Sequence, residues 1–415
     1  MGTVSVEAVV AATDTSRQAG TTGVARKPGE SFALLMAAAL ALPGITALAA
    51  DANLRSDTPT LSYNHGNYQE SGMRMDVRID QLAASFPIGG RMELRVNTIR
   101  DVSSGASPFA NRMVNGKPVM LLASAASIRD TRNAVDVGAG YYGDDQYVGA
   151  TVGQSIENDY KSRFASADYR RYFNDRNTVV SLGTGFSNDT VWDKYYPLQR
   201  GSRPSVEHGR RRIDLVAGVT QIIDPKTVST VTLSHGHAYG YLNDQYRRAQ
   251  VVIDSAPSFI ADTRPDVHTQ VVATGRISRY IEPIRSALHL DYRFAHDSWG
   301  ADSHTLEAKL RIERGSGWSV APGLRYTTQK NADFYQLSYA GMPDNGLVSS
   351  DYRLAAFGAI SPKLEVVKTF ASGITVRASV ERYFRRYGYR VGRGRGDAVD
   401  DFQARLLSLS IDGAF

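Results

Sequence analysis

Stretches with one apolar and one polar face recur through most of this chain, and they constrain its fold more than any other feature. Within residues 286–294, apolar and polar side chains alternate: Leu288, Leu290, Tyr292 and Phe294 lie on one side, and His289, Asp291 and Arg293 on the other. Similar alternation marks 73–80, 178–186, 213–219, 304–313, 318–328 and 374–380. Because successive side chains of a strand point to opposite faces, each stretch predicts a two-sided β-strand.

The length of these stretches favours a membrane protein over a soluble β-sandwich. Sandwich strands would alternate too, but they typically run for about five or six residues. The strands that contain these stretches are expected to run for roughly nine to twelve residues, which is the length that crosses a bilayer at a tilt. An apolar face toward lipid and a charged face toward a wet lumen explains all of them together. A mean hydropathy of −0.29 excludes a bundle of membrane helices, and the absence of cysteine excludes stabilisation by disulfides.

The connections between the stretches fall into two lengths. Tight turns are predicted at 87–90, 143–145, 174–176, 224–226, 282–283, 315–317 and 371–373, and long polar loops at 102–132, 190–210, 239–267, 329–350 and 388–401. Bacterial barrels need an even strand number with both ends in the periplasm, so a further strand is expected at 60–68. We therefore predict an all-β fold: a single antiparallel transmembrane β-barrel of about 16 strands, with 14 the next best number, short periplasmic turns and long extracellular loops.

The N-terminal region has the order of a secretory signal peptide. Arg17, Arg26 and Lys27 precede an apolar run at 32–42, and a small-residue site at 47–49 follows. The run is too short to span a bilayer comfortably, although an uncleaved anchor is the alternative. The predicted organisation is a cleaved signal peptide at 1–50, a polar lead at 51–58 and a barrel at 59–415, located in a Gram-negative outer membrane.

The last strand-length stretch has the alternation of a closing barrel strand. Its apolar face carries Leu407, Leu409, Ile411 and Phe415. This pattern resembles the terminal signal that the barrel-assembly machinery recognises, although Gly413 stands where that signal usually has a hydrophobic residue.

Several segments together resemble one family of Gram-negative outer-membrane barrels. They are 101–108, 157–162, 291–293, 297–300, 303–307, 324–329 and 332–335, of which the block around Trp299 and Phe334 is the most specific. The chain resembles an uncharacterised family catalogued as a domain of unknown function, number 3570, over essentially the whole mature length.

The resemblance implies a fold and a compartment but no chemistry. Relatives are often encoded beside a flavin transferase, a thioredoxin-like protein and a small lipoprotein. This implies a periplasmic redox protein or lipoprotein as partner, in a redox or flavin-linked system. The sequence itself has no apparent flavinylation site, and no cofactor is expected.

Charged residues on the predicted strands are expected to face the lumen. They are Arg74, Asp76, Arg78, Asp291, Arg293, Glu307, Lys309 and Arg325. A basic excess could favour anions in a water-filled channel. The alternative is a ladder of opposite charges that pair between neighbouring strands and rigidify the wall.

A basic and aromatic stretch spans the top of the penultimate predicted strand and its outer loop. Its residues include Arg385, Arg386, Tyr387, Tyr389 and Arg390. Arginine and aromatic side chains together can bind nucleic acid. At the rim of an outer-membrane barrel, however, the phosphates of lipopolysaccharide are the nearer anions. We therefore expect contacts with membrane lipid and lipopolysaccharide, and no nucleic acid.

Two function classes remain open. The leading hypothesis is a porin-like channel or an envelope scaffold that serves a partner system. The alternative is an outer-membrane barrel enzyme with a lipid- or peptide-hydrolysing site at the extracellular rim, for which Asp297, Ser303 and His304 have the residue types of a catalytic triad. No nucleophile elbow is present. The histidine spacings are weak as a metal signal, and no metal site is predicted.

Overall fold

The strands of this protein form one closed antiparallel barrel. The computed structural model describes residues 57–73, 75–104, 108–114, 117–122, 130–193, 206–392 and 401–415. Within them, sixteen strands make the wall in this order: β1 (Thr60–Glu70), β2 (Asp76–Ile88), β3 (Met92–Ser104), β6 (Asp130–Tyr142), β7 (Gln146–Ile156), β8 (Tyr160–Phe173), β9 (Thr178–Asp193), β10 (Val206–Asp224), β11 (Thr227–Gly240), β14 (Val267–Ile281), β15 (Ser286–Asp297), β16 (Asp302–Gly315), β17 (Trp318–Gln329), β19 (Phe357–Thr369), β20 (Thr375–Arg386) and β21 (Phe402–Ala414). The last strand pairs with the first from Thr60↔Ala414 to Glu70↔Ala404, which removes every free edge of the wall.

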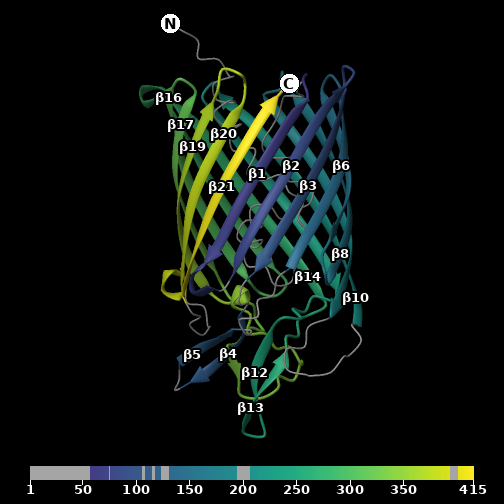
Figure 1. Ribbon diagram of the computed structural model, residues 1–415, viewed down its shortest axis with the longest axis vertical. Coiled ribbons are helices and arrows are strands. Elements are labelled where there is room, and N and C mark those ends of the chain that lie inside the picture. The colour runs from purple at the N-terminus through teal and green to yellow at the C-terminus, as the bar shows by residue number, and fades with distance from the viewer. Residues whose placement is uncertain are drawn as a thin grey trace.

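The predicted fold class is confirmed, including the number sixteen and the weak first strand. The tight turns gather at the end of the barrel where β21 finishes, and the longer connections gather at the opposite end (Figure 1). By the topology rule for such barrels, the end with the tight turns is periplasmic and the other end is extracellular. The predicted signal peptide lies outside the described residues, as do most of the polar lead and Arg74.

The outer face of the wall is apolar along the middle of the strands. Leu290, Leu306 and Leu324 occupy neighbouring strands on one face and are 41%, 54% and 53% exposed, whereas His289 on the opposite face is buried. In the described residues, no helix is long and apolar enough to cross a membrane. Because the exposed leucines lie on the outer face, the wall meets lipid with its apolar side, while a closed strand ladder pairs its backbone polar groups.

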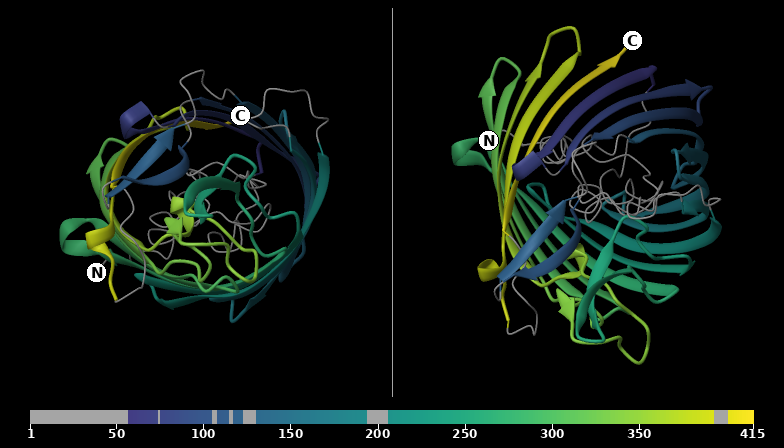
Figure 2. Two further views of the ribbon diagram at one scale, coloured as in Figure 1. Left: turned by 90° about the horizontal axis from the view of Figure 1, so that it is seen from below. Right: turned by 60° about the horizontal axis from the view of Figure 1, so that its bottom comes forward.

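Two long connections fold into the extracellular mouth. Residues 241–266 join β11 to β14 and contain β12 (Arg248–Ile253) and β13 (Ala256–Ala261); residues 330–356 join β17 to β19 and contain β18 (Ser338–Tyr339) and η4 (Tyr352–Leu354). Strands β12, β13 and β18 form a small sheet of their own. Viewed from this end, both segments lie across the opening of the ring (Figure 2), and β12 and β13 extend beyond the end of the wall (Figure 1). We call them together the plug.

The remaining short elements are peripheral. A hairpin of β4 (Pro108–Val114) and β5 (Lys117–Leu122) lies beyond the extracellular end of the wall, and η2 (Ser71–Met73), η3 (Glu282–Ile284) and η5 (Tyr387–Tyr389) occupy connections between wall strands (Figure 1).

Candidate functional site

The plug packs against the inner wall near the extracellular end. Its buried side chains Tyr335, Leu337 and Tyr352 belong to one apolar cluster with wall residues from β1, β2, β19, β20 and β21: Tyr68, Val77, Ala359, Tyr383, Phe402 and Ala404. Each fully buried large side chain contributes about 1.5–3 kcal/mol through removal of apolar surface from water. The plug is therefore fixed to this side of the ring.

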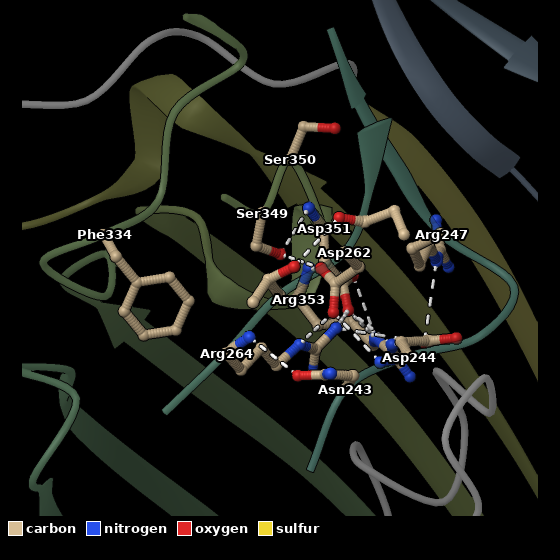
Figure 3. A network of polar contacts seen from close by, with 12 residues as sticks. Asn243, Asp244, Arg247, Asp262, Arg264, Phe334, Ser349, Ser350, Asp351 and Arg353 are labelled. Carbon is tan, nitrogen blue, oxygen red and sulfur yellow. Dashed lines mark hydrogen bonds and ion pairs between the residues drawn. The ribbon is translucent and has the colours of Figure 1, made fainter. Parts of the chain in front are cut away.

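A compact group of opposite charges joins the two halves of the plug (Figure 3). Three aspartates and three arginines make it up: Asp244, Arg247, Asp262 and Arg264 from one segment, Asp351 and Arg353 from the other. The aspartate side chains are 0% exposed and those of the arginines 4–10%. We call these six residues the charge cluster.

Arg353 lies at the centre of the charge cluster. Its guanidinium contacts Asp244 across the two segments, and its Nε donates to Asp351 Oδ2 at 2.7 Å. Arg264 makes a second bridge between the segments, with Nη2 at 2.8 Å from Asp351 Oδ2 and Nε at 2.6 Å from Asp262 Oδ2. Because buried charges are costly unless they are paired, these contacts hold the two segments in one arrangement.

The pKa values of Asp351 and Asp262 are shifted in opposite directions. Burial by itself would raise the pKa of Asp351, but the charges of Arg353, Arg247 and Arg264 outweigh burial and hold that pKa well below its usual range. Burial raises the pKa of Asp262, and the charge of Arg264 offsets this only in part. Asp351 is therefore the carboxylate whose ionised form most favours the docked plug.

A second anchor ties the plug to the other side of the mouth. Asp159, in the connection between β7 and β8, accepts hydrogen bonds from Gln245 Nε2 at 2.6 Å and from the Tyr246 hydroxyl. Burial and the Asp159 charge raise the pKa of Tyr246, which keeps this hydroxyl a donor. Carboxylate oxygens of Asp130, Glu157 and Asp159 lie within 4.8 Å of one another. Among the described residues, this is the one group of side chains with the types and spacing of metal ligands. No sequence spacing indicated this group.

The block around Trp299 clamps the start of the second plug segment. The indole ring contacts Phe334 edge to face, with centroids 5.5 Å apart, and its Nε1 donates to Val267 O at 2.9 Å. The Trp299 carbonyl accepts from Asp333 N at 2.8 Å. Gly300 has φ +82°, and a Cβ there would come within 2.3 Å of the Asp333 carboxylate, so only glycine fits. The residues that carried the family resemblance thus meet in space.

Replacing Trp299 with alanine should release this segment from the wall. The variant loses a buried ring and one hydrogen bond, a change that typically costs about 3–5 kcal/mol in a packed interior. We expect trypsin, added to the outside of reconstituted vesicles, to cleave after Lys330 and Arg353 in the variant and to leave the native plug intact. The control is Trp192→Ala, because Trp192 lies outside this contact. Equal cleavage of the native protein and of Trp299→Ala would contradict the proposed clamp.

The structure divides the predicted lumen charges into two groups. Asp291, Arg293, Glu307, Lys309 and Arg325 lie on the inward face of β15–β17, opposite to the exposed leucines. Within this group, Arg325 Nε is 2.7 Å from Glu307 Oε2 and Nη1 is 3.1 Å from Glu381 Oε1, while Asp291 pairs with Arg276. The Arg325–Glu307 and Arg276–Asp291 contacts join residues directly opposite on neighbouring strands, whereas Arg325–Glu381 reaches across β19 from β17 to β20.

Asp76 and Arg78 lie on the opposite face from the one expected. They share the outer face of β2 with Leu82 and Phe86, while Val77 is buried against the plug. The reason is local. Above the hydrocarbon layer the outer face is polar, and at this height the inner face is apolar because the plug packs against it. At this end of β2, therefore, polar side chains point outward and apolar side chains point inward, which is the reverse of the arrangement in the membrane.

Side chains of the basic and aromatic stretch also lie on both sides of the wall. Arg385 points inward and is 3% exposed; its Nη2 donates to the Tyr352 carbonyl at 2.5 Å, and its guanidinium lies 4.2 Å from the Phe357 ring centroid. It holds the plug and cannot reach lipid, which corrects the expected rim role. Arg386 is exposed on the outer face, where Tyr387, Tyr389 and Arg390 follow in η5 and the residue after it.

The three triad candidates do not converge. Ser303 and His304 are successive strand residues and so point to opposite sides of the wall. His304 lies outside, with Nδ1 at 2.8 Å from the Tyr292 hydroxyl, whereas Asp297 faces inward and pairs with His268 at 3.0 Å. The hydrolase hypothesis for these residues is therefore wrong.

The closing strand presents its apolar side to the exterior. Leu407, Leu409, Ile411 and Phe415 are 39%, 39%, 42% and 69% exposed on β21 and just after it, and Phe415 N donates to Pro59 O at 3.0 Å. The segment expected to act as an assembly signal thus lies at the seam where the barrel closes.

Solved structures with a similar barrel are distant in sequence. A bacterial polysaccharide outer membrane secretin has 10% identity and a TM-score of 0.49, with 87% of this chain and 100% of that chain covered. The monoaromatic hydrocarbon channel CymD has 12% identity and a TM-score of 0.41, over 87% and 89%. The siderophore receptor PirA from Acinetobacter baumannii has 8% identity and a TM-score of 0.44, over 80% of this chain and 54% of the receptor. This likeness concerns the fold alone, and no curated protein matches the chain.

The family comparison covers most of the sequence. Residues 32–400 match the model described as protein of unknown function (DUF3570). With its closed sixteen-stranded wall and apolar exterior, the chain is an outer-membrane β-barrel, and it belongs to this family.

Proposed function

We propose that this protein is a channel of the outer membrane whose extracellular entrance is closed by the plug. The charge cluster is the observation that supports this proposal most directly, because it fixes two loops across the mouth of a barrel whose inner wall is charged. Barrels of sixteen strands are wide enough to enclose an aqueous path when the interior is clear. The docked plug represents the closed state, and a scaffold without conductance is the competing version of the same architecture.

Removing half of the plug is the direct test. Gln329 and Phe357 are paired neighbours on β17 and β19, so a short Gly-Asn turn can replace residues 331–355 without disturbing the wall. In planar bilayers we expect little current from the native protein and steady, porin-like current from the shortened one. Shortening the connection between β20 and β21 instead is the control, because η5 lies outside the wall.

Two results would contradict the proposal. A native protein that conducts as well as the shortened form would mean that the plug does not close the mouth. A shortened protein that folds but carries no current would mean that the lumen is blocked elsewhere, which favours the scaffold.

Strong acid should undock the plug. The pKa of Asp351 is lowered in the docked state, so this carboxylate stabilises docking above its ordinary pKa of about 3.9, and the stabilisation is lost as the pH falls below that value. The raised pKa of Asp262 acts in the opposite direction, because its protonated form is favoured in the docked plug. We expect little current between pH 7 and about 4.5 and a rise below about 4. A current that falls throughout acidification would contradict this assignment.

The partner system is a separate part of the proposal. The resemblance implies a periplasmic redox protein or lipoprotein, which would meet the barrel at the end with the tight turns. Crosslinking from Arg314, exposed beside one of these turns, followed by mass spectrometry tests this role. Recovery of assembly factors alone would argue against a dedicated partner. The cleaved signal peptide is tested by the N-terminal sequence of the mature protein.

A further inference from the structure

Two arginines face each other on the outer surface of the closing seam. Arg382 on β20 and Arg405 on β21 are directly paired in the register, and the next pairs on the same face are Val380↔Leu407 and Ala378↔Leu409. Side chains opposite each other in antiparallel strands have Cβ atoms about 5 Å apart. Leu407 and Leu409 are both 39% exposed on the lipid side, which places the two guanidinium groups on that side as well.

Within the part of the chain that the structure describes, the facing pair Arg382 and Arg405 has no acidic partner. Among the described residues, no carboxylate lies within ion-pair distance of Arg382 or Arg405; the Arg405 Nη2 donates to the neutral Gln69 Oε1 at 3.2 Å. Arg386 lies further along the same face of β20, so that Arg382, Arg386 and Arg405 form a row of arginines. The Arg386 Nε is 3.9 Å from Asp401 Oδ2, and both of these side chains are at least half exposed. Like charges opposite each other destabilise a strand pair unless an anion lies between them.

The row lies at a defined height on the wall. Toward the middle of the membrane the same face carries only apolar side chains on these two strands, from Val380 and Leu407 onward. Toward the outside, β20 ends at Arg386. The guanidinium groups therefore occupy the boundary between hydrocarbon and water in the extracellular leaflet, where lipid headgroups lie.

The turn after β20 extends this surface along the outside of the wall. The η5 turn lies against β19: a Cβ at Gly358 would come within 2.1 Å of the Tyr389 carbonyl carbon, and the Tyr326 hydroxyl donates to Tyr389 O at 2.5 Å. The Arg390 guanidinium lies 3.6 Å from the Tyr387 ring centroid. In Figure 1 this turn is the yellow coil outside the barrel at the lower end of β19–β21. It adds a stacked cation and aromatic rings next to the arginine row.

From this surface we infer that Arg382, Arg386 and Arg405 bind the phosphate groups on the lipid anchor of lipopolysaccharide. A guanidinium group matches the oxygens of a phosphate with paired hydrogen bonds, and one phosphate between Arg382 and Arg405 removes their repulsion. Phe384, between Arg382 and Arg386 on the same face, offers an apolar contact to the acyl chains. The site is independent of the plug and of any conductance.

The test compares two lipids and two double variants. Folded full-length protein in detergent is titrated with lipid A that carries both phosphates and with lipid A from which they have been removed, and binding is followed by thermophoresis. Native protein should prefer the phosphorylated lipid. The variant R382Q/R405Q should bind it about tenfold more weakly, as expected for lost hydrogen bonds to a charged group. The variant R279Q/R314Q, with the same loss of charge near the periplasmic end, should bind as the native protein does.

Three results would overturn the inference. They are equal binding of the two lipids by native protein, unchanged binding by R382Q/R405Q, and an equal loss in R279Q/R314Q. Folding of each variant is checked by its heat-dependent gel mobility. If the double variant does not fold, R382Q alone is measured, and the preference of native protein for the phosphorylated lipid remains decisive.

Discussion

Replacing Arg353 with alanine should open the barrel. The substitution leaves Asp351 and Asp244 buried with their central partner gone, and breaking a buried ion pair typically costs about 3–5 kcal/mol. A loss of that size shifts the balance between docked and undocked plug by roughly two to four orders of magnitude. In planar bilayers the variant should carry sustained current at pH 7, where the native protein carries little.

Two control variants distinguish the loss of plug docking from the loss of one positive charge. Arg314→Ala removes a cation from an exposed position by a periplasmic turn and should leave the current unchanged. Arg353→Lys keeps the charge but loses the paired geometry, so an intermediate current is expected. If Arg353→Ala conducts no more than native protein, the charge cluster does not hold the entrance closed.

Placing an arginine at Leu290 should destabilise the whole barrel. Leu290 lies near the middle of β15 on the lipid-facing side, opposite Ala308 and Ile277. A cation at the midplane of a barrel's lipid face costs about 2–4 kcal/mol. We expect that loss in the free energy of unfolding by guanidinium in phospholipid vesicles. Leu290→Ala measures what the missing leucine alone contributes and should cost less. A tolerated arginine would mean that this face does not meet lipid.

The sequence predicted the barrel well because lipid leaves few alternatives. A strand that crosses the membrane must satisfy its backbone in a closed ladder, and its two faces must differ, so periodicity and turn spacing were sufficient to predict sixteen strands. The same rule was wrong at the rim. Val77 is apolar because it contacts the plug, and Arg385 is charged because it binds a plug carbonyl. Periodicity cannot distinguish these environments from lipid and water.

The plug itself had no signal in the sequence. Its central contact joins Asp244 and Arg353, which are 109 residues apart in two different loops, and neither loop has a regular pattern. The triad hypothesis failed for a simpler reason. Ser303 and His304 were grouped with Asp297 by residue type, but β16 extends through both and separates them to opposite sides of the wall.

The joining of two distant loops has a consequence for biogenesis. Strand β12 can meet β18 only when β11 and β17, which precede the two loops, already stand in the same sheet. We therefore expect the charge cluster to be completed late, once both loops lie at the extracellular end of the barrel. An antibody specific for the joined loops would recognise mature molecules and ignore those stalled during insertion, which makes this epitope a reporter of successful assembly in living cells.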